Sequence, residues 1–441
     1  MKKRLFFIAL LTLALSGCGN MNNSSNLTSS TSSSSSSTSS STSSTSSSSS
    51  SSSISVDLTN YQLFEHNKGE DKTMEYFYNY CPTIFEEDGV RHIYYCANKK
   101  HGNVTDYVAY RKGVKDETGR FIYSDIQYVL EPTENSWDSR HVCDPSVVKG
   151  EFTYNQENYN YLMAYLGCVT SDNTSNEVGL AVSKSPEGPW IKVGDGPFCD
   201  YELNDNSGFQ WGYGQPSLVS VDRKSEILLF YTVGDGKSTY EVVERWNLKD
   251  LNNPQMVSDG SKRVITRGLK NLNGLQDYIS NADYAYDPTS GRIYMIKDDH
   301  PSPDGANVSS SATICYLEED FENPDFYPGY TLFNVVGDSW NEMDKIDVSI
   351  SGYNLNHNCG LATDPYGWTL SNTSIDCVYT VANNYSSFWG AGWLYKIQLE
   401  KEHVYFMAHR KQVHLDPNNQ TSTISGIVYP ADDRGLFEIK E

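Results

Sequence analysis

CPTIFEEDGVRHIYYC, residues 81–96, is the stretch that decides the fold, because its pattern returns four more times along the chain. In each copy a polar residue precedes a short apolar run, and a turn leads to a second run that is often rich in tyrosine. The other copies start at residues 144–147 (DPSV), 215–218 (QPSL), 281–284 (NADY) and 359–362 (CGLA). Such self-similarity is typical of a repeat architecture.

Each copy contains three short runs of β-branched and aromatic residues, separated by Gly, Asn, Asp and Pro. The second runs occupy residues 93–96, 162–165, 228–231, 293–296 and 378–381, and the third runs occupy residues 108–110, 178–182, 242–243, 314–316 and 394–397. This is strand and turn chemistry rather than helical periodicity. The sequence therefore predicts an all-β chain of hairpins.

The spacing within the copies indicates how the hairpins are built. Twelve positions separate Pro82 from Tyr94, and the same spacing recurs from residue 216 to 228 and from 282 to 294. We therefore expect these three copies to share one register. A single meander leaves apolar faces exposed, so five of them gain most by packing radially, which predicts a five-bladed β-propeller. A β-sandwich is the alternative, because short strands alone fit both folds.

The N-terminus has the features of an export signal. Basic residues 2–4 precede an apolar run over residues 5–15, which is too short to span a bilayer as a helix. Residues 15–18 (LSGC) resemble a bacterial lipobox, which implies that Cys18 becomes a lipidated first residue carrying palmitate. We therefore expect a lipoprotein outside the cytoplasm, anchored to the bacterial cell membrane or envelope by lipid alone.

The composition divides the chain into three parts. Residues 1–18 form the signal and lipidated Cys, and residues 19–55 form a linker dominated by Ser and Thr, which cannot bury apolar surface and is expected to be disordered. Residues 56–441 are long enough for one large propeller domain. The formal net charge of −22 argues against a nucleic-acid partner, because phosphate binding needs a basic face. We expect a monomer with an uncharged partner.

Eight cysteines follow Cys18 in a chain expected to be exported, where disulfides are permitted. A two-residue turn at Asp88-Gly89 would place Cys81 and Cys96 opposite each other. Cys143 and Cys168 bracket the second hairpin in a similar way. Buried free cysteines in strands are the equal alternative.

In a propeller, the starts of the first and third strands and the end of the second lie at one mouth of the central channel. The residues expected there include many carboxylates, amides and aromatic rings. Amides and carboxylates bind hydroxyl groups in pairs, and flat rings cover the C–H faces of a sugar. The sequence therefore predicts an oligo- or polysaccharide ligand, with Trp211, Tyr213, Gln215, Asn281, His357 and Trp389 as its binding residues.

The second copy carries a family resemblance. Its DPS opening at residues 144–146 and its third strand, GLAVSKSPEGPW at residues 179–190, resemble the five-bladed glycoside hydrolases of family 43 and its relatives in families 32, 117 and 130. The turn at residues 356–358 (NHN) is similar to the His-bearing turn that lies near a bound cation in family 43. The resemblance, which covers roughly residues 76–399, makes His357 a candidate ligand for a metal ion such as calcium near the channel.

The chain also departs from family 43. The family usually carries an Asp base at the opening of blade one and a Glu acid at the opening of blade three. Here Cys81 and Gly214-Gln215 stand at those places, and only blade two keeps its acid, Asp144. The family's catalytic triad therefore does not carry over intact.

Hydrolysis of a glycosidic bond normally needs two carboxyl groups. The candidates at the channel mouth are Asp144, Glu177 and Asp283, and Asp298-Asp299-His300 is the reserve group. We expect a cell-surface glycosidase that degrades plant or host polysaccharides, with arabinofuranosyl or xylosyl linkages favoured by the resemblance. The alternative is a glycan-binding propeller without catalytic activity, because two acids of the family pattern are missing.

Overall fold

All regular elements in the described residues of this computed structural model are β-strands, as the sequence predicts. The described residues are 60–63, 79–99, 105–170, 174–258, 260–302, 308–318, 339–348, 353–384, 387–398, 411–415, 421–425, 428–430 and 437–439. The signal, Cys18 and most of the Ser-rich linker lie outside these ranges. No helix in the described residues is long and apolar enough to cross a membrane.

Most strands belong to five antiparallel strand groups, one for each sequence copy. The first contains β2 (Asn79–Glu87), β3 (Val90–Asn98), β4 (Asp106–Lys115), β5 (Phe121–Tyr123) and β6 (Gln127–Leu130). The second contains β7 (His141–Tyr154), β8 (Glu157–Cys168), β9 (Glu177–Ser183) and β10 (Ile191–Lys192). The third contains β11 (Gly212–Tyr213), β12 (Ser217–Ser220), β13 (Glu226–Gly234), β14 (Thr239–Asn247), β15 (Gln255–Met256) and β16 (Lys262–Arg263).

The fourth group contains β17 (Ala282–Asp287), β18 (Arg292–Asp298), β19 (Ser311–Glu318) and β20 (Asn341–Asp347). The fifth contains β21 (Leu355–Asn356), β22 (Gly360–Thr363), β23 (Ser374–Asn384), β24 (Ser387–Gln398) and β1 (Asn60–Gln62). Two further hairpins pair β25 (Lys411–Leu415) with β26 (Thr421–Ser425) and β27 (Val428–Pro430) with β28 (Phe437–Ile439).

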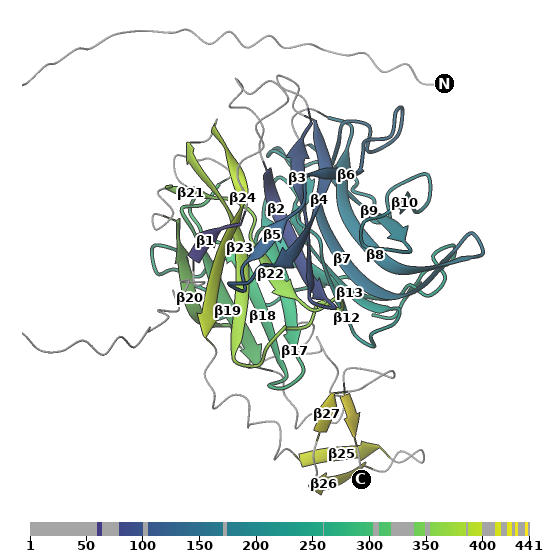
Figure 1. The fold of residues 1–441 in the computed structure, drawn as a ribbon, viewed down its shortest axis with the longest axis vertical. Coiled ribbons are helices and arrows are strands. Elements are labelled where there is room, and N and C mark those ends of the chain that lie inside the picture. The colour runs from purple at the N-terminus through teal and green to yellow at the C-terminus, as the bar shows by residue number, and fades with distance from the viewer. Residues whose placement is uncertain are drawn as a thin grey trace, which may run out of the picture. The chain divides into compact units, whose positions relative to one another are not determined.

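The five inner strands contact one another in a closed ring. In order around the ring, β2 contacts β7, β7 contacts β12, β12 contacts β17, β17 contacts β22, and β22 returns to β2. The last contact is a parallel pairing that joins the first and fifth groups into one sheet, and Figure 1 shows β22 beside β2. The N-terminal β1 pairs with β24, so both ends of the described repeat region contribute to the fifth group. Two sheets packed face to face would not give this ring.

Small polar side chains connect the inner strands at one repeating position. The hydroxyl of Ser146 in β7 accepts a hydrogen bond from Leu218 N in β12 at 2.9 Å, and Ser217 in β12 accepts one from Tyr284 N in β17 at 3.1 Å. Asp283 in β17 accepts one from Leu361 N in β22 at 2.8 Å. Each of these strands thus gives the next an acceptor for a buried N–H that has no backbone partner across the ring.

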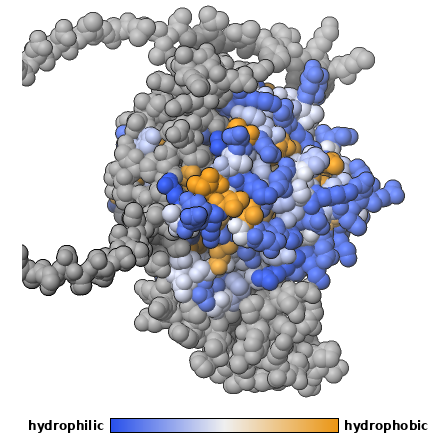
Figure 2. All heavy atoms as spheres, in the orientation of Figure 1, coloured by the Kyte–Doolittle hydropathy of each residue, from blue (hydrophilic) through white to orange (hydrophobic). Residues whose placement is uncertain are grey.

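The tyrosines of the second strands form the core between the groups. Tyr94, Tyr165, Tyr294 and Tyr379 are all fully or almost fully buried. Rings from neighbouring groups also stack, as Phe230 and Tyr284 do with their centroids 4.0 Å apart. The coloured part of the face drawn in Figure 2 is largely hydrophilic around a smaller apolar cluster.

The expected common register holds for only two of the three copies. Ser217 faces Phe230 and Asp283 faces Ile296, but Thr83 faces Tyr94. The first hairpin is shorter because Asp88 and Gly89, with φ values of 50° and 79°, form the predicted two-residue turn. The equal spacing in the sequence therefore does not give equal pairing.

The register also decides between disulfides and free thiols for the described cysteines. A bulge between Tyr80 and Thr83 moves Cys81 out of line, and Cys96 faces Tyr80. Cys143 faces Leu166 rather than Cys168. All eight cysteines after Cys18 are buried and free, so the free-cysteine alternative describes this structure.

Replacing Asp283 by Ala should lower the free energy of unfolding by about 3 kcal/mol, because the Leu361 N–H and the Ser217 hydroxyl lose a buried acceptor. Urea denaturation of the two proteins measures the difference. Replacement of the exposed Asp195 by Ala is the control and should change stability little. Equal stability of Asp283→Ala and wild type would show that the ring does not depend on this contact.

Candidate functional site

Four inner strands each have a residue at or close to their start with an unusual backbone conformation, and we call this residue the head of the strand. Cys81, Asp144, Asn281 and Asn358 have φ values of 49°, 47°, 50° and 50°, in the left-handed region that residues other than Gly rarely adopt. The first two sit in bulges, which change the direction of a side chain. In the fifth copy the head is thus Asn358, one residue before the position that the sequence pattern indicates. Asp144, Asn281 and Asn358 line the same pocket.

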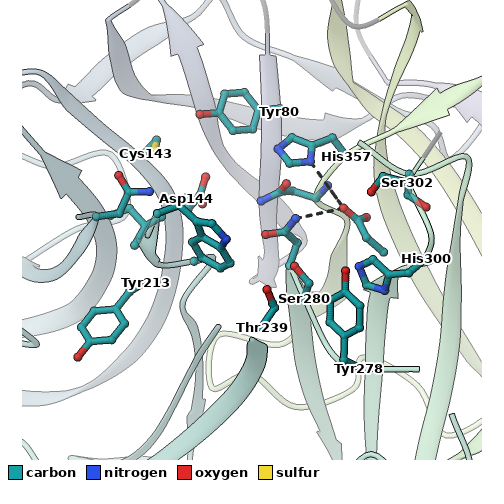
Figure 3. A pocket seen from close by; sticks show the side chains of 18 residues that line it. Tyr80, Cys143, Asp144, Tyr213, Thr239, Tyr278, Ser280, His300, Ser302 and His357 are labelled. Atoms are coloured by element: carbon teal, nitrogen blue, oxygen red, sulfur yellow. Dashed lines mark hydrogen bonds and ion pairs between the residues drawn. The ribbon is translucent and has the colours of Figure 1, made fainter. Parts of the chain in front are cut away.

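The pocket draws on several strand groups. It is lined by Tyr80, Cys143, Asp144, Leu166, Asn176, Trp211, Tyr213, Gly214, Thr239, Tyr278, Ser280, Asn281, Asp298, His300, Ser302, Ser309, His357 and Asn358. Figure 3 shows Cys143, Asp144 and Tyr213 on one side and His300, Ser302 and His357 on the other. None of these lining residues is Lys or Arg. The pocket is therefore rich in hydroxyls, amides, aromatic rings and carboxylates.

Asp144 is the carboxyl group on the first side of the pocket. Its side chain is almost completely buried, and its Oδ1 accepts a hydrogen bond from the Cys96 thiol at 3.2 Å. Burial raises the pKa of Asp144, and the Cys96 donor and nearby His357 oppose this rise. The structure thus places the acid of the second copy at the pocket, as the sequence indicates.

Asp298 is the carboxyl group on the other side. Its oxygens accept hydrogen bonds from Asn356 Nδ2 at 2.8 Å, Asn281 Nδ2 at 3.3 Å and Asn358 N at 3.3 Å. His357 Nδ1 lies 3.6 Å from Asp298 Oδ2, a contact drawn as a dashed line in Figure 3. Four nitrogen atoms therefore surround this carboxylate.

The nitrogen atoms around Asp298 can be compared with the ligands that the expected cation at His357 would need. Calcium is held by six to eight oxygen ligands. The neighbours of Asp298 offer it N–H donors instead, so its oxygens are satisfied by described residues rather than by an ion. His357 lies beside the Asp298 carboxylate, and its ring stacks on Tyr80 with centroids 5.7 Å apart.

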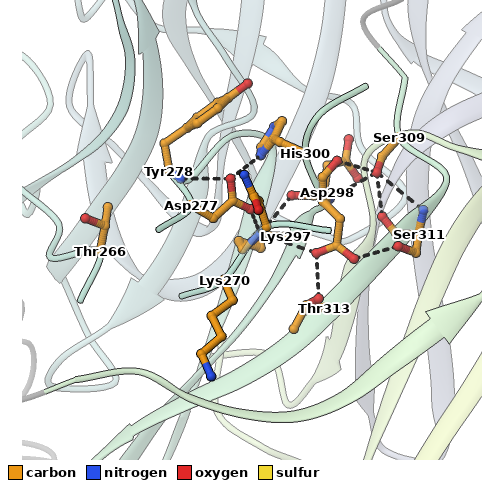
Figure 4. Close-up of polar contacts among 12 residues, drawn as sticks. Thr266, Lys270, Asp277, Tyr278, Lys297, Asp298, His300, Ser309, Ser311 and Thr313 are labelled. Carbon is orange, nitrogen blue, oxygen red and sulfur yellow. Dashed lines mark hydrogen bonds and ion pairs between the residues drawn. The ribbon is translucent and has the colours of Figure 1, made fainter. Parts of the chain in front are cut away.

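His300 is held in place beside Asp298 by a buried polar network (Figure 4). Its Nδ1 lies 3.0 Å from Asp277 Oδ1, and its ring stacks on Tyr278 with centroids 3.8 Å apart. Lys297 donates to Asp277 at 2.5 Å and also contacts Asp299 at 3.4 Å. Burial alone would raise the pKa of Asp277, but His300 and Lys297 hold it below its usual value. The network fixes the orientation of His300 toward the pocket.

Trp211 and Tyr213 form the aromatic part of the lining. The Trp211 ring lies directly against Gly234 and Gly214, where an added Cβ would overlap the indole. Tyr213 packs edge-on against Tyr231, with centroids 4.7 Å apart. Glycine at both positions therefore gives the flat ring space to lie at the pocket.

Glu177, a predicted catalytic residue, is not among the pocket-lining residues. It begins β9 and is half-buried beside Asp200. Burial and the Asp200 carboxyl raise the pKa of Glu177 to about 8. Its neighbour Asn176 reaches the pocket instead.

Asp283 and Gln215, predicted as a catalytic and a binding residue, are not among the pocket-lining residues either. Both oxygens of Asp283 are engaged in the ring of inner strands, and burial raises its pKa to about 6. Gln215 is buried and donates from Nε2 to the Cys359 carbonyl at 2.9 Å. Both residues connect strand groups. Trp389 belongs to β24, but its side chain lies outside the described part of the structure.

The structure adds pocket residues that the sequence analysis missed, among them Tyr80 and Tyr278. Tyr278 precedes the inner strand of the fourth group, just as Trp211 and Tyr213 precede that of the third. The same positional rule, applied to the fourth copy, finds it. Tyr80 precedes the bulge at Cys81, and no signal in the sequence distinguishes it from the neighbouring tyrosines.

Comparisons with known proteins give structural likeness only. No protein-family model and no curated protein matches the chain. Similar solved structures include Zg3597, a family 117 glycoside hydrolase from Zobellia galactanivorans, at 13% identity and a TM-score of 0.45, covering 77% of this chain and 87% of that one. A thermostable family-43 glycoside hydrolase aligns at 14% identity and a TM-score of 0.46, covering 74% and 90%.

The endo-arabinase of Bacteroides thetaiotaomicron aligns at 12% identity and a TM-score of 0.44, covering 74% of this chain and 95% of that chain. These structural neighbours are glycoside hydrolases, the group of enzymes that the second sequence copy resembles.

The Glu177–Asp200 pair predicts a pH dependence of stability. The pKa of Glu177 is about 8 in the folded chain, against 4.5 as its ordinary value, so its contribution is fully present below about pH 4.5 and is lost as the pH rises through about 8. Glu177→Gln should therefore lose less thermal stability than wild type between about pH 6 and about pH 9.

Thermal unfolding followed by circular dichroism at several pH values measures this difference. Replacement of the exposed Glu202 by Gln is the control and should keep the wild-type dependence. A Glu177→Gln curve parallel to that of wild type would contradict the assignment.

Proposed function

We propose that the chain is a glycoside hydrolase that cleaves an uncharged glycan in the pocket between Asp144 and Asp298. One observation carries the proposal: carboxyl groups from the second and fourth strand groups line one pocket together with aromatic rings and amides. Hydrolysis of a glycosidic bond normally uses two such groups, one that donates a proton to the leaving oxygen and one that acts as base or nucleophile.

The surroundings of the two carboxyl groups suggest their roles. Three N–H groups hold the oxygens of Asp298, which suits a carboxylate that attacks the sugar or activates water. Asp144, on the other side, is then the proton donor to the leaving group. His300, which Asp277 orients, is placed to bind a sugar hydroxyl.

The other lining residues indicate the class of substrate. Trp211 and Tyr213 offer flat faces to sugar C–H groups, and Asn176, Asn281 and Asn358 offer amides to hydroxyls. The lack of Lys and Arg among the lining residues favours a neutral sugar over an acidic one. Within this class we propose arabinofuranosyl or xylosyl linkages of plant or host glycans, following the family resemblance of the second copy.

The architecture and location that we propose follow from the same features. Five strand groups around a closed ring of inner strands are best described as a five-bladed β-propeller with the pocket at one mouth. The lipobox-like residues 15–18 and the Ser-rich linker support a monomeric lipoprotein that is attached through Cys18 outside the cytoplasm. The linker would hold the propeller away from the membrane, within reach of polymers.

A glycan-binding propeller without activity is the second candidate. It is favoured by Cys81 and Gln215, which occupy positions where family 43 enzymes carry acids and which are buried here. Binding of an oligosaccharide in the pocket without turnover of any glycoside would identify this function.

Asp144→Asn and Asp298→Asn should each lower kcat/KM by about 100-fold or more, because each removes one of the two groups that handle protons or charge at the glycosidic bond. A panel of aryl glycosides and of arabinan, xylan and fructan oligomers provides the substrates. Asp195→Asn, at an exposed site away from the pocket, is the matched control. Full activity in either pocket variant would remove that residue from the mechanism.

A further inference from the structure

Three cysteines gather behind the side of the pocket formed by Asp144. Cys81 comes from β2, Cys96 from β3, and Cys143 from β7 directly before Asp144. The sulfurs of Cys96 and Cys143 and a carboxylate oxygen of Asp144 all lie within 4.8 Å of one another. The Cys81 thiol lies near Cys96 and Asp144, and both residues influence its pKa.

This cluster differs from ordinary buried cysteines because its members face one another. The Cys96 sulfur lies within 4.8 Å of the Cys143 sulfur and donates to Asp144 Oδ1 at 3.2 Å, and both Cys81 and Cys143 influence its pKa. Donor atoms around a tetrahedral zinc ion with Zn–S bonds of about 2.3 Å are separated by about 3.8 Å. Cys96 Sγ and Asp144 Oδ1 are 3.2 Å apart, and the Cys143 sulfur lies within 4.8 Å of both, so small side-chain shifts would bring these three donors to that spacing. The Cys81 sulfur lies outside this group of three and would complete the geometry by moving toward it.

The cluster is open to ions from solvent on one side. Cys143 and Asp144 line the pocket, as Figure 3 shows, whereas Cys96 is fully buried behind them. Burial raises the pKa of the Cys96 thiol, because a thiolate without a nearby positive charge is poorly stabilised in the interior. A divalent cation would supply the positive charge that stabilises buried thiolates.

We propose that Cys96, Cys143 and Asp144 form a binding site for a thiophilic divalent metal ion such as Zn²⁺, with Cys81 as its fourth ligand. Binding replaces S–H bonds by metal–sulfur bonds and releases the thiol protons to solvent, with no change of oxidation state. Thiolate ligands select Zn²⁺ and Cd²⁺ over calcium and magnesium.

The proposal goes beyond the proposed hydrolase function and is tested without it. If both proposals hold, Asp144 cannot serve both at once, because a carboxylate bound to a metal cannot donate a proton. Metal binding would then inhibit hydrolysis, and removal of the metal by a chelator would restore it.

Titration of the purified, reduced full chain with Cd²⁺ tests the site through the ultraviolet charge-transfer absorption of cadmium thiolates. We expect one equivalent to bind per chain in wild type, and this absorption to be lost in Cys96→Ser and Cys143→Ser. Cys168→Ser is the matched control, because Cys168 is buried in the same strand group as Cys143 and its thiol contacts the Thr170 carbonyl instead of the cluster. It should bind Cd²⁺ like wild type.

A second variant keeps the test decisive if the serine variants fail to fold. Asp144→Asn retains the three thiols and should bind Cd²⁺ with affinity lower by about tenfold or more, because one ligand is weakened. The proposal is overturned if wild type shows no charge-transfer absorption, if Cys96→Ser keeps it, or if Asp144→Asn binds like wild type. Peptide mapping that finds Cys96 in a disulfide in the protein as isolated would also overturn it.

Discussion

The structure depends on how its five inner strands satisfy their buried backbone groups. Except for β2 and β22, neighbouring inner strands do not pair through their backbones in the described residues. Ser146, Ser217 and Asp283 supply side-chain acceptors instead, each for an N–H of the next strand. At the same place in the fifth copy stands Gly360, where a Cβ would overlap the Pro82 carbonyl. This position therefore allows a short polar side chain or, as at Gly360, no side chain.

This constraint also explains where the pocket lies. The acceptor residue is two positions after the head of its strand, so the contacts that close the ring bring the heads together at one end. There the left-handed conformation of Asp144, Asn281 and Asn358 accompanies side chains that reach the pocket. The ring therefore joins groups that are more than two hundred residues apart in sequence, and the bulges and turns at its edge determine which of them meet solvent.

Much of this could be predicted from the sequence, because strand chemistry is local. The all-β fold, the second and third strands and the Asp88-Gly89 turn are confirmed. The pairing register was harder to predict, because it depends on the length of the turn and on bulges. Neither can be recognised from the equal spacing of residues in the sequence copies. Asp144, Trp211, Tyr213, Asn281 and His357 were placed at the pocket by their positions next to strands. The sequence does not place Asp283, because a carboxylate at a strand start serves equally well as a catalytic acid and as a hydrogen-bond acceptor for the next strand, and the structure shows the second arrangement.

The most direct measurement of the central claim is a crystal structure of the Asp144→Asn variant soaked with a short neutral oligosaccharide. We expect a sugar ring over Trp211, with its glycosidic oxygen near residue 144 and its anomeric carbon facing Asp298, at one mouth of a closed ring of five inner strands. An oligosaccharide bound on another face while this pocket holds only water, or inner strands that do not close into a ring, would contradict it.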